Sequence, residues 1–186
     1  MICVVDVSRV LGLYAIGLFP MDEPGRPELP WWTADPRTIF ELDPASLQAT
    51  RRKVRRSMAA GEREGWALRL DLGFEEVLES CARPRHDGDG VWITERLKDV
   101  YRALHAAGRA HSFELRDGDE LLAGVLAVTL DGAAMLESMF HRRPHAGNVA
   151  LVLTLEALAA AGCALCDVQL STDHLAHAER GQVRDQ

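Results

Sequence analysis

The sequence predicts an α+β fold, with a small N-terminal α/β subdomain over residues 1–83 followed by a second domain over residues 84–186. Two observations lead to this prediction. Residues 111–140 contain three apolar segments separated by short polar turns at 117–120 and 131–132, which is typical of antiparallel strands joined by hairpins. Segments with apolar residues at helical spacing lie on both sides of these strands. With 186 residues, 47% of them hydrophobic, the chain is long enough to bury a core.

The first subdomain begins with a short helix that Asp6 or Ser8 can cap. The paired tryptophans Trp31 and Trp32 stand between prolines, which predicts a rigid aromatic loop in which at least one ring serves packing. Hydrophobic periodicity and turn residues then predict the following elements: helix 6–16, strand 38–42, strand 66–72 and helix 74–82.

The second domain is separated from the first by the polar, glycine- and proline-rich segment 83–90. Thr94 is a suitable N-cap for a helix that runs to Gly108. The elements expected after it are strands 111–116, 121–129 and 133–140, helix 148–161 and strand 164–170. A helix, a three-stranded antiparallel meander, a helix and a strand fit an acetyltransferase-like (GNAT) domain, although a fold-level analogy does not name a reaction.

The charge distribution leaves nucleic-acid binding open. The net charge of −7 argues against it. However, the thirteen residues 51–63 contain a dense basic block with a single glutamate: Arg51, Arg52, Lys53, Arg55, Arg56 and Arg63, with Glu62. Such a block forms either a solvated helix face or a contact with phosphate groups, and composition does not separate the two.

The sequence shows no clear sign of a membrane, secreted or metal-binding protein. No apolar segment has the length of a membrane span, and the N-terminus lacks the features of a secretory signal, so we expect a cytoplasmic protein without a membrane partner. Four cysteines do not suggest a secreted disulfide scaffold. Cys163 and Cys166 form half of a zinc or redox spacing, but no second pair follows, and Cys166 begins an apolar strand. We therefore expect no metal.

Three polar residues lie in apolar strands of the second domain. Asp167 and Gln169 are two residues apart near the end of the last strand, so strand alternation predicts that they share a face. Glu137 lies near the end of the third meander strand. Because buried polar groups need hydrogen-bond partners, the three are candidates for one cluster. Either it is a satisfied core network or it is a functional site beside an apolar pocket lined by Met139, Leu151 and Leu158.

Several motifs in a fixed order resemble the leucyl/phenylalanyl-tRNA–protein transferase family. The resemblance runs from about residue 6 to residue 176. Its carriers are Gly-Leu-Phe-Pro-Met at 17–21, Trp-Trp-Thr-Ala-Asp-Pro-Arg at 31–37, Trp-Ile-Thr at 92–94, Tyr101 with Leu104 and His105, His111 with Ser112, Glu-Ser-Met-Phe at 137–140, Asp-Val-Gln at 167–169, and Asp173 with His174. Each motif alone is weak, and their order and spacing make the resemblance specific.

The resemblance implies that leucine or phenylalanine, and less often methionine, moves from its tRNA to the N-terminal amine of a protein that begins with Arg or Lys. The product would be marked for N-end-rule degradation. The aminoacyl ester is already activated, and about a tenth to a fifth of an α-amine is neutral near pH 7. Positioning and stabilisation of developing charge can therefore supply the rate, without a covalent nucleophile, a metal or another cofactor.

The resemblance also implies roles for single residues. Asp167 and Gln169 would be the catalytic pair, supported electrostatically by Glu137, whose negative charge would also favour a cationic N-terminal residue. The residues implied around the terminal adenosine of the tRNA are Trp92 as the stacking ring, Tyr14, Tyr101, and Met21 in place of a second stacking tryptophan. The side-chain pocket would be formed by Met139, Leu151 and Leu158, and the contacts with the tRNA backbone by Arg51, Arg52, Arg55 and Arg56.

Two alternatives stay open. The chain is shorter at both ends than the family pattern, so it could be a truncated, non-catalytic paralogue that binds tRNA or protein N-termini. It could also be a CoA-dependent acetyltransferase on the same fold. That class binds pyrophosphate in a glycine-rich loop, and the corresponding segment 142–148 has one glycine, Gly147, and a proline, Pro144, that removes a donor.

Overall fold

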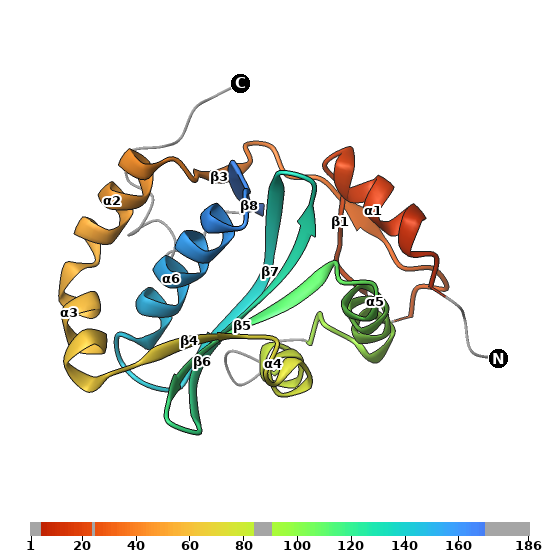
Figure 1. The fold of residues 1–186 in the computed structure, drawn as a ribbon. Helices are drawn as coiled ribbons and strands as arrows, with labels where there is room; N and C mark the ends of the chain where they lie inside the picture. The colour runs from red at the N-terminus through yellow and green to blue at the C-terminus, as the bar shows by residue number, and fades with distance from the viewer. Residues whose placement is uncertain (1–4, 24, 84–90, 170–186) are drawn as a thin grey trace.

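A central mixed β-sheet with helices on both faces forms the molecule (Figure 1). The computed structural model describes residues 5–23, 25–83 and 91–169. The helices are α1 (Val7–Ala15), α2 (Pro44–Lys53), α3 (Arg55–Glu64), α4 (Phe74–Cys81), α5 (Glu95–Ala106) and α6 (Ala146–Ala160). The strands are β1 (Phe19–Pro20), β2 (Trp31–Trp32), β3 (Thr38–Glu41), β4 (Ala67–Leu70), β5 (Ala110–Asp117), β6 (Glu120–Leu130), β7 (Ala133–His141) and β8 (Leu165–Gln169). The prediction of a fold that combines helices with a sheet is confirmed.

The six strands of the main sheet lie in the order β3-β8-β7-β6-β5-β4. Strands β4 to β7 pair antiparallel with their neighbours, whereas β8 lies parallel to β7 and antiparallel to β3. Helix α6 connects the two parallel strands, as a parallel pair requires a long connection. Strands β3 and β4 come from the first 83 residues and join the same sheet as the strands that follow residue 84.

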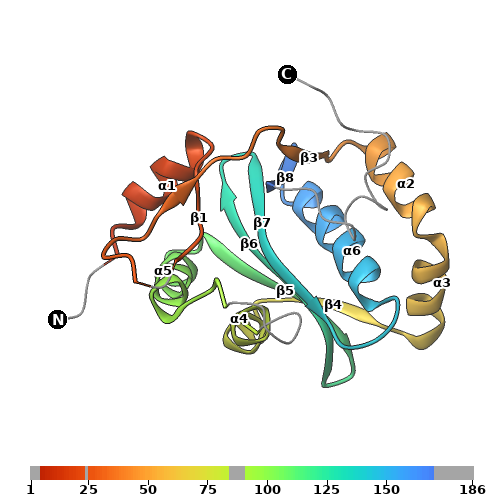
Figure 2. The same ribbon diagram turned by 180° about the vertical axis from the view of Figure 1, so that it is seen from behind.

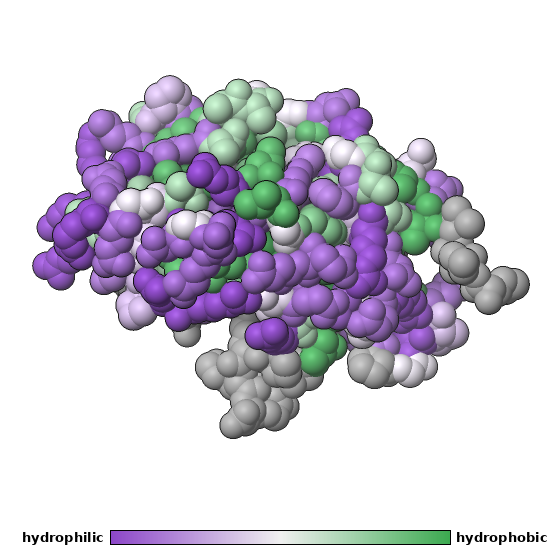
Figure 3. Space-filling view, turned by 60° about the horizontal axis from the view of Figure 1, so that its bottom comes forward, coloured by the Kyte–Doolittle hydropathy of each residue, from purple (hydrophilic) through white to green (hydrophobic). Residues whose placement is uncertain are grey.

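Two hydrophobic cores lie on the two faces of this sheet. Helices α2, α3 and α6 cover one face, and α1, α4 and α5 cover the other, as the two opposite views show (Figures 1 and 2). Leu121–Val128 of β6 is buried without interruption, because this strand lies inside the sheet and both of its faces are covered. The face drawn in Figure 3 is mainly hydrophilic with separate apolar patches.

Local signals explain where the helices begin. Asp6 caps α1 by accepting a hydrogen bond from the Arg9 backbone N–H at 3.1 Å. Thr94 caps α5 in the same way through the Leu97 N–H. Both caps agree with the sequence prediction. The aromatic loop differs from its prediction, because Phe19–Pro20 and Trp31–Trp32 form a small two-stranded antiparallel sheet.

Candidate active site

A continuous chain of hydrogen bonds joins the end of β8 to β7 and α5. Asp167 Oδ1 accepts from the Gln169 backbone N–H at 2.7 Å, and Gln169 Nε2 donates to Glu137 Oε1 at 3.2 Å. The Tyr101 hydroxyl donates to the other oxygen of Glu137 at 2.8 Å. The structure therefore brings together the three polar residues that the sequence places in one cluster, and the tyrosine of α5 joins them.

Irregular backbone in the middle of β7 and at the end of β8 produces this arrangement, so Glu137 does not lie near the end of its strand as the sequence predicts. In the β6–β7 pairing, Leu126 lies opposite Ser138 and Ala127 opposite Leu136, so Glu137 is the extra residue of a β-bulge. In the β3–β8 pairing, Thr38 lies opposite Gln169 and Ile39 opposite Asp167, so Val168 is the extra residue of a second β-bulge. A bulge changes the direction of a side chain and leaves a backbone group unpaired, and both bulges lie beside the polar cluster.

The backbone leaves regular strand geometry at Gln169. Gln169 has φ of 62°, a left-handed conformation that a side chain other than glycine rarely adopts. The carboxylate of Asp167 holds the backbone of Gln169, while the Gln169 side chain reaches Glu137. The two residues are thus linked through the Gln169 backbone, which the aspartate holds in a turn.

Burial sets the electrostatics of the cluster. Glu137 is 8% exposed, and its burial raises the pKa of its carboxyl group to about 7, against the hydrogen bonds from Tyr101 and Gln169 and the nearby Tyr14 hydroxyl, which lower the pKa. Burial also raises the pKa of Asp167, an effect opposed by the Gln169 N–H and by the positive charge of Arg37. The site therefore holds one carboxyl group that changes protonation near neutral pH beside a second one with a cationic partner.

Tyr14 and Tyr101 are both buried on the α1/α5 side of the sheet. Burial raises the pKa of each hydroxyl well above its usual value, with Glu137 as the next cause. The Tyr14 hydroxyl is close enough to affect Glu137, yet within the described part of the chain it makes no hydrogen bond of normal geometry. Its ring meets Trp31 edge-on at 5.7 Å between centroids.

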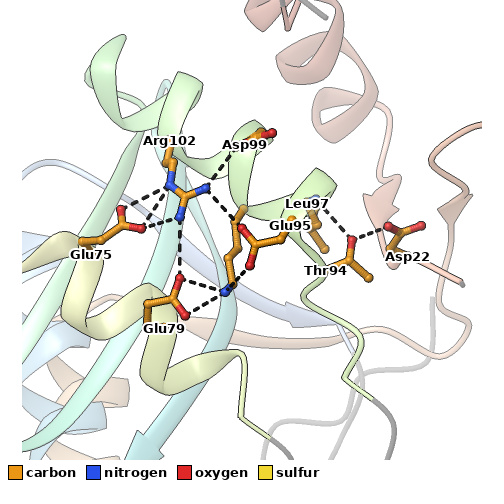
Figure 4. A network of polar contacts seen from close by, with 9 residues as sticks. Asp22, Glu75, Glu79, Thr94, Glu95, Leu97, Asp99 and Arg102 are labelled. Carbon is orange, nitrogen blue, oxygen red and sulfur yellow. Dashed lines mark hydrogen bonds and ion pairs between the residues drawn. The ribbon is translucent and has the colours of Figure 1, made fainter. Parts of the chain in front are cut away.

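The predicted adenosine-binding residues Trp92 and Met21 are partly buried and pack against the core that contains Tyr14 and Tyr101. A network of polar contacts holds this region. Trp32 Nε1 donates to the Met21 carbonyl at 3.1 Å. The neighbouring Asp22 accepts from Arg96 and from Thr94 at the start of α5 (Figure 4). The loop of Met21 is thus fixed to the helix that Trp92 precedes.

The predicted pocket residues occupy the other core. Leu151 and Leu158 are 1% and 2% exposed and lie in the core covered by α6, against which Met139 packs. Glu137 contacts Tyr101 of α5, on the opposite side of the sheet. The structure therefore brings Met139, Leu151 and Leu158 together with one another, and the pocket role of these residues stays a prediction.

The four predicted tRNA-binding arginines lie at the junction of α2 and α3. Arg51 forms ion pairs with Glu62 at 2.8 Å and Glu156 at 2.9 Å. Arg52 is bonded to Gln48 within α2. Arg55 and Arg56 are exposed and form no ion pair with a residue that the structure describes. The basic block is thus a helix surface on which two arginines carry uncompensated charge.

Within residues 5–23, 25–83 and 91–169, the structure contains no group of three His, Cys, Asp or Glu side chains suited to a metal ion. None of the helices there combines the length and the apolar character needed to cross a bilayer. The Asp173-His174 motif lies outside the described residues.

Two contacts of this site are not predicted by the sequence. Arg37 donates to Asp167 Oδ2 at 2.7 Å across 130 residues of chain. The Asp22–Thr94 contact joins residues 72 positions apart. The position of Arg37 in the Asp-Pro-Arg motif was the available signal, and the partner of an arginine cannot be deduced from such a motif.

Comparison with known proteins identifies the family. Residues 42–185 match the model of the leucyl/phenylalanyl-tRNA protein transferase family. The chain belongs to this family. It is 41% identical over 171 residues to the leucyl/phenylalanyl-tRNA–protein transferase of Anaeromyxobacter dehalogenans, covering 91% of the chain and 70% of that relative. The resemblance expected from the motifs is confirmed.

Other relatives agree. The transferase of Pseudomonas putida is 39% identical, with 90% of the chain and 71% of the relative covered. That of Xanthomonas oryzae is 38% identical, with 90% of the chain and 65% of the relative covered.

Among solved structures, FemX matches with a TM-score of 0.56 at 13% identity, covering 89% of this chain and 60% of that one. L-PGS from Bacillus licheniformis matches with a TM-score of 0.53 at 14% identity, covering 90% and 54%. These two structures share the fold with the chain.

Proposed function

We propose that the protein transfers leucine or phenylalanine, and less often methionine, from aminoacyl-tRNA to the N-terminal Arg or Lys of an acceptor protein. The acceptor would thereby be marked for N-end-rule degradation. The observation that carries this proposal is the hydrogen-bonded chain Asp167–Gln169–Glu137–Tyr101 in a member of this transferase family. It supplies oriented polar groups at the end of a strand, which a reaction that depends on positioning needs.

The Gln169 side chain is suited to hold the attacking amine. Its amide nitrogen donates to Glu137, so the carbonyl oxygen is oriented, and no described residue donates a hydrogen bond to that oxygen. An amine N–H can donate to it. The carboxylate of Asp167 fixes the Gln169 backbone and adds negative charge beside the nitrogen, which becomes positive as it attacks the ester carbon.

Glu137 is suited to respond to a cationic substrate. Its carboxyl group has a pKa of about 7 because it is buried. A positive charge within a few ångströms favours the ionised form of a carboxyl group, so an N-terminal Arg or Lys would convert Glu137 to its anion on binding. This supports the proposed preference for cationic acceptors.

The remaining substrate contacts follow the family pattern. We assign stacking on the terminal adenosine to Trp92, with Tyr14, Tyr101 and Met21 as neighbours, and ring-on-base stacking is worth about 1–3 kcal/mol. The amino-acid side chain is assigned to Met139, Leu151 and Leu158. The tRNA backbone is assigned to Arg51, Arg52, Arg55 and Arg56, where the exposure of Arg55 and Arg56 supports a phosphate contact.

We also propose that residues 84–186 form an acetyltransferase-like (GNAT) catalytic domain and residues 1–83 a binding subdomain of a cytoplasmic enzyme. The antiparallel order of β5, β6 and β7, followed by α6 and the parallel strand β8, supports the first assignment. The aromatic strands and the basic helices α2 and α3 precede residue 84, which supports the second.

The test uses the full chain, tRNA carrying labelled leucine, and a peptide with N-terminal Arg. We expect label transfer to this peptide and not to the same peptide with an acetylated N-terminus. Transfer should be lost in Asp167→Ala and strongly reduced in Gln169→Ala. Binding of the charged tRNA without transfer would instead support a non-catalytic paralogue, and binding of acetyl-CoA in calorimetry would support an acetyltransferase.

A further inference from the structure

Arg37 joins three separate parts of the chain beside the candidate site. Its guanidinium donates to Asp167 Oδ2 at 2.7 Å and to the Gly17 carbonyl at 2.6 Å. It also lies over the ring of Phe19, 5.9 Å from the centroid. The Arg37 side chain is 25% exposed and that of Asp167 is 9% exposed, so this ion pair is largely shielded from water.

The two oxygens of the Asp167 carboxylate have different partners. Oδ2 is held by Arg37, and Oδ1 accepts the backbone N–H of Gln169. That second bond closes the turn in which Gln169 has φ of 62°, and this turn directs the Gln169 amide to Glu137. An orientation imposed on Asp167 is therefore passed on to Gln169.

The charged and titratable groups that face Asp167 in the described structure come from three elements. Arg37 precedes β3, Glu137 lies on β7, and the buried thiol of Cys166 is adjacent on β8. Arg37 is the cation among them. Burial raises the pKa of Asp167, and the charge of Arg37 opposes that rise.

We propose that Arg37 is a positioning residue of this site, which holds one oxygen of Asp167 so that the other oxygen fixes the Gln169 turn and aims the Gln169 amide at Glu137. The geometry is independent of the reaction, while the consequence for transfer rests on the proposed function. Lysine should replace Arg37 only in part, because one ammonium group lacks the planar fork that reaches both Asp167 and the Gly17 carbonyl.

The first experiment follows Asp167 by NMR, without reference to activity. The full chain, labelled with ¹³C and ¹⁵N, is titrated as wild type, Arg37→Met and Arg37→Lys, with the Asp167 signal assigned through Asp167→Asn. In Arg37→Met we expect the midpoint of the Asp167 titration to rise by about one pH unit or more. The Gln169 amide hydrogen should exchange roughly tenfold faster. Arg37→Lys should lie between the two.

Arg142→Met is the matched control. Arg142 also donates to a carboxylate, Glu76, and to a backbone carbonyl, that of Leu121, and it lies over the ring of Phe140. Arg142 therefore makes the same three kinds of contact as Arg37, but it does so at a site that does not include Asp167. The Asp167 titration and the Gln169 exchange should match the wild type in this variant. If Arg37→Met changes them no more than Arg142→Met does, the proposal is overturned.

The second experiment measures transfer to the peptide with N-terminal Arg. We expect Arg37→Met to lower kcat roughly a hundredfold near pH 6 with a smaller change in KM, because the positioned pair is displaced. Part of the loss relative to the wild type should be recovered as the pH rises, because a higher pH favours the ionised form of an Asp167 that has lost its cationic partner. If the wild type transfers no label, the proposed function fails while the NMR titration still decides the role of Arg37. If Arg37→Met has the rate and the pH profile of the wild type, the role proposed for Arg37 is overturned and the proposed function stands. If Arg37→Met does not fold, Arg37→Lys against Arg142→Met decides both measurements.

Discussion

Glu137 is a carboxyl group that the fold removes from water and surrounds with hydroxyl and amide donors. Its hydrogen bonds with Tyr101 and Gln169 favour the anion, yet burial outweighs them and the pKa rises from the ordinary 4.5 to about 7. A folded-state pKa above the unfolded value means that the unionised form is favoured by folding. The stabilising effect is complete below about pH 4.5 and is lost as the pH rises through about 7.

This gives a prediction for the stability of the folded chain. The free energy of unfolding should decrease by about 3 kcal/mol on account of Glu137 as the pH rises from about 4 to about 9. Glu137→Gln removes the titrating group, so its stability should decrease less over the same range. Urea denaturation at a series of pH values measures both proteins, and Glu41→Gln, a change at an exposed position of β3, serves as the control. Parallel curves for wild type and Glu137→Gln would contradict the prediction.

At the residue scale, the sequence indicates which side chains of the site lie close together, but not the backbone geometry and contacts that bring them together. Glu137, Asp167 and Gln169 stand out because each interrupts an apolar strand. The bulge at Glu137 and the left-handed conformation of Gln169 depend on pairing with β6 and β3, which no local pattern reveals. The contact between Arg37 and Asp167 spans 130 residues and is equally invisible in the sequence.

Elements with many residues in a regular pattern are predicted well. The bounds of β5, β6, β7, α4 and α5 lie within one or two residues of those expected from periodicity and caps. Strands β1 and β2 were not expected as strands, because two residues each are too few for an alternation to appear. The pairing of Phe19 with Trp32 is a tertiary feature.

Helix α1 and strand β6 offer a prediction about glycine in two environments. A Cβ on Gly124 of β6 would lie 2.6 Å from Phe140 Cε1 and 3.0 Å from Val77, so Gly124→Ala forces buried groups apart. We expect a loss of about 1–3 kcal/mol in the free energy of unfolding. Gly12 of α1 has no such neighbours, so Gly12→Ala should stabilise the chain by about 0.5–1 kcal/mol. Denaturation of both variants beside the wild type measures the contrast, and equal effects of one sign would contradict it.

At the scale of the whole molecule, the sheet order is the feature that the sequence did not predict. Strands β3 and β4 flank α2 and α3 in the chain but lie at opposite edges of the sheet. The two helices therefore cross the face covered by α6 (Figures 1 and 2). Arg52, Arg55 and Arg56 at their junction are exposed. The chain carries a net charge of −7, so any attraction to RNA must come from such a local surface.

The salt dependence of tRNA binding tests this surface. Each phosphate contact that is lost should reduce the slope of log affinity against log salt by about 0.7–0.9. We expect this reduction for Arg55→Gln and for Arg56→Gln, because these side chains are exposed and form no ion pair with a described residue. Arg51→Gln should change the slope less, since Arg51 is already paired with Glu62 and Glu156.

Arg109→Gln provides the control, because Arg109 is 40% exposed and pairs with Asp131 on a different part of the sheet. Its removal lowers the net charge by the same amount without touching α2 or α3. Filter binding or fluorescence anisotropy over a series of salt concentrations gives the slopes of the wild type and the four variants. If Arg109→Gln flattens the slope as much as Arg55→Gln does, the effect is one of total charge and the tRNA does not contact the α2–α3 junction. If only the variants at this junction flatten it, the basic helices are the RNA-binding surface of an otherwise acidic protein.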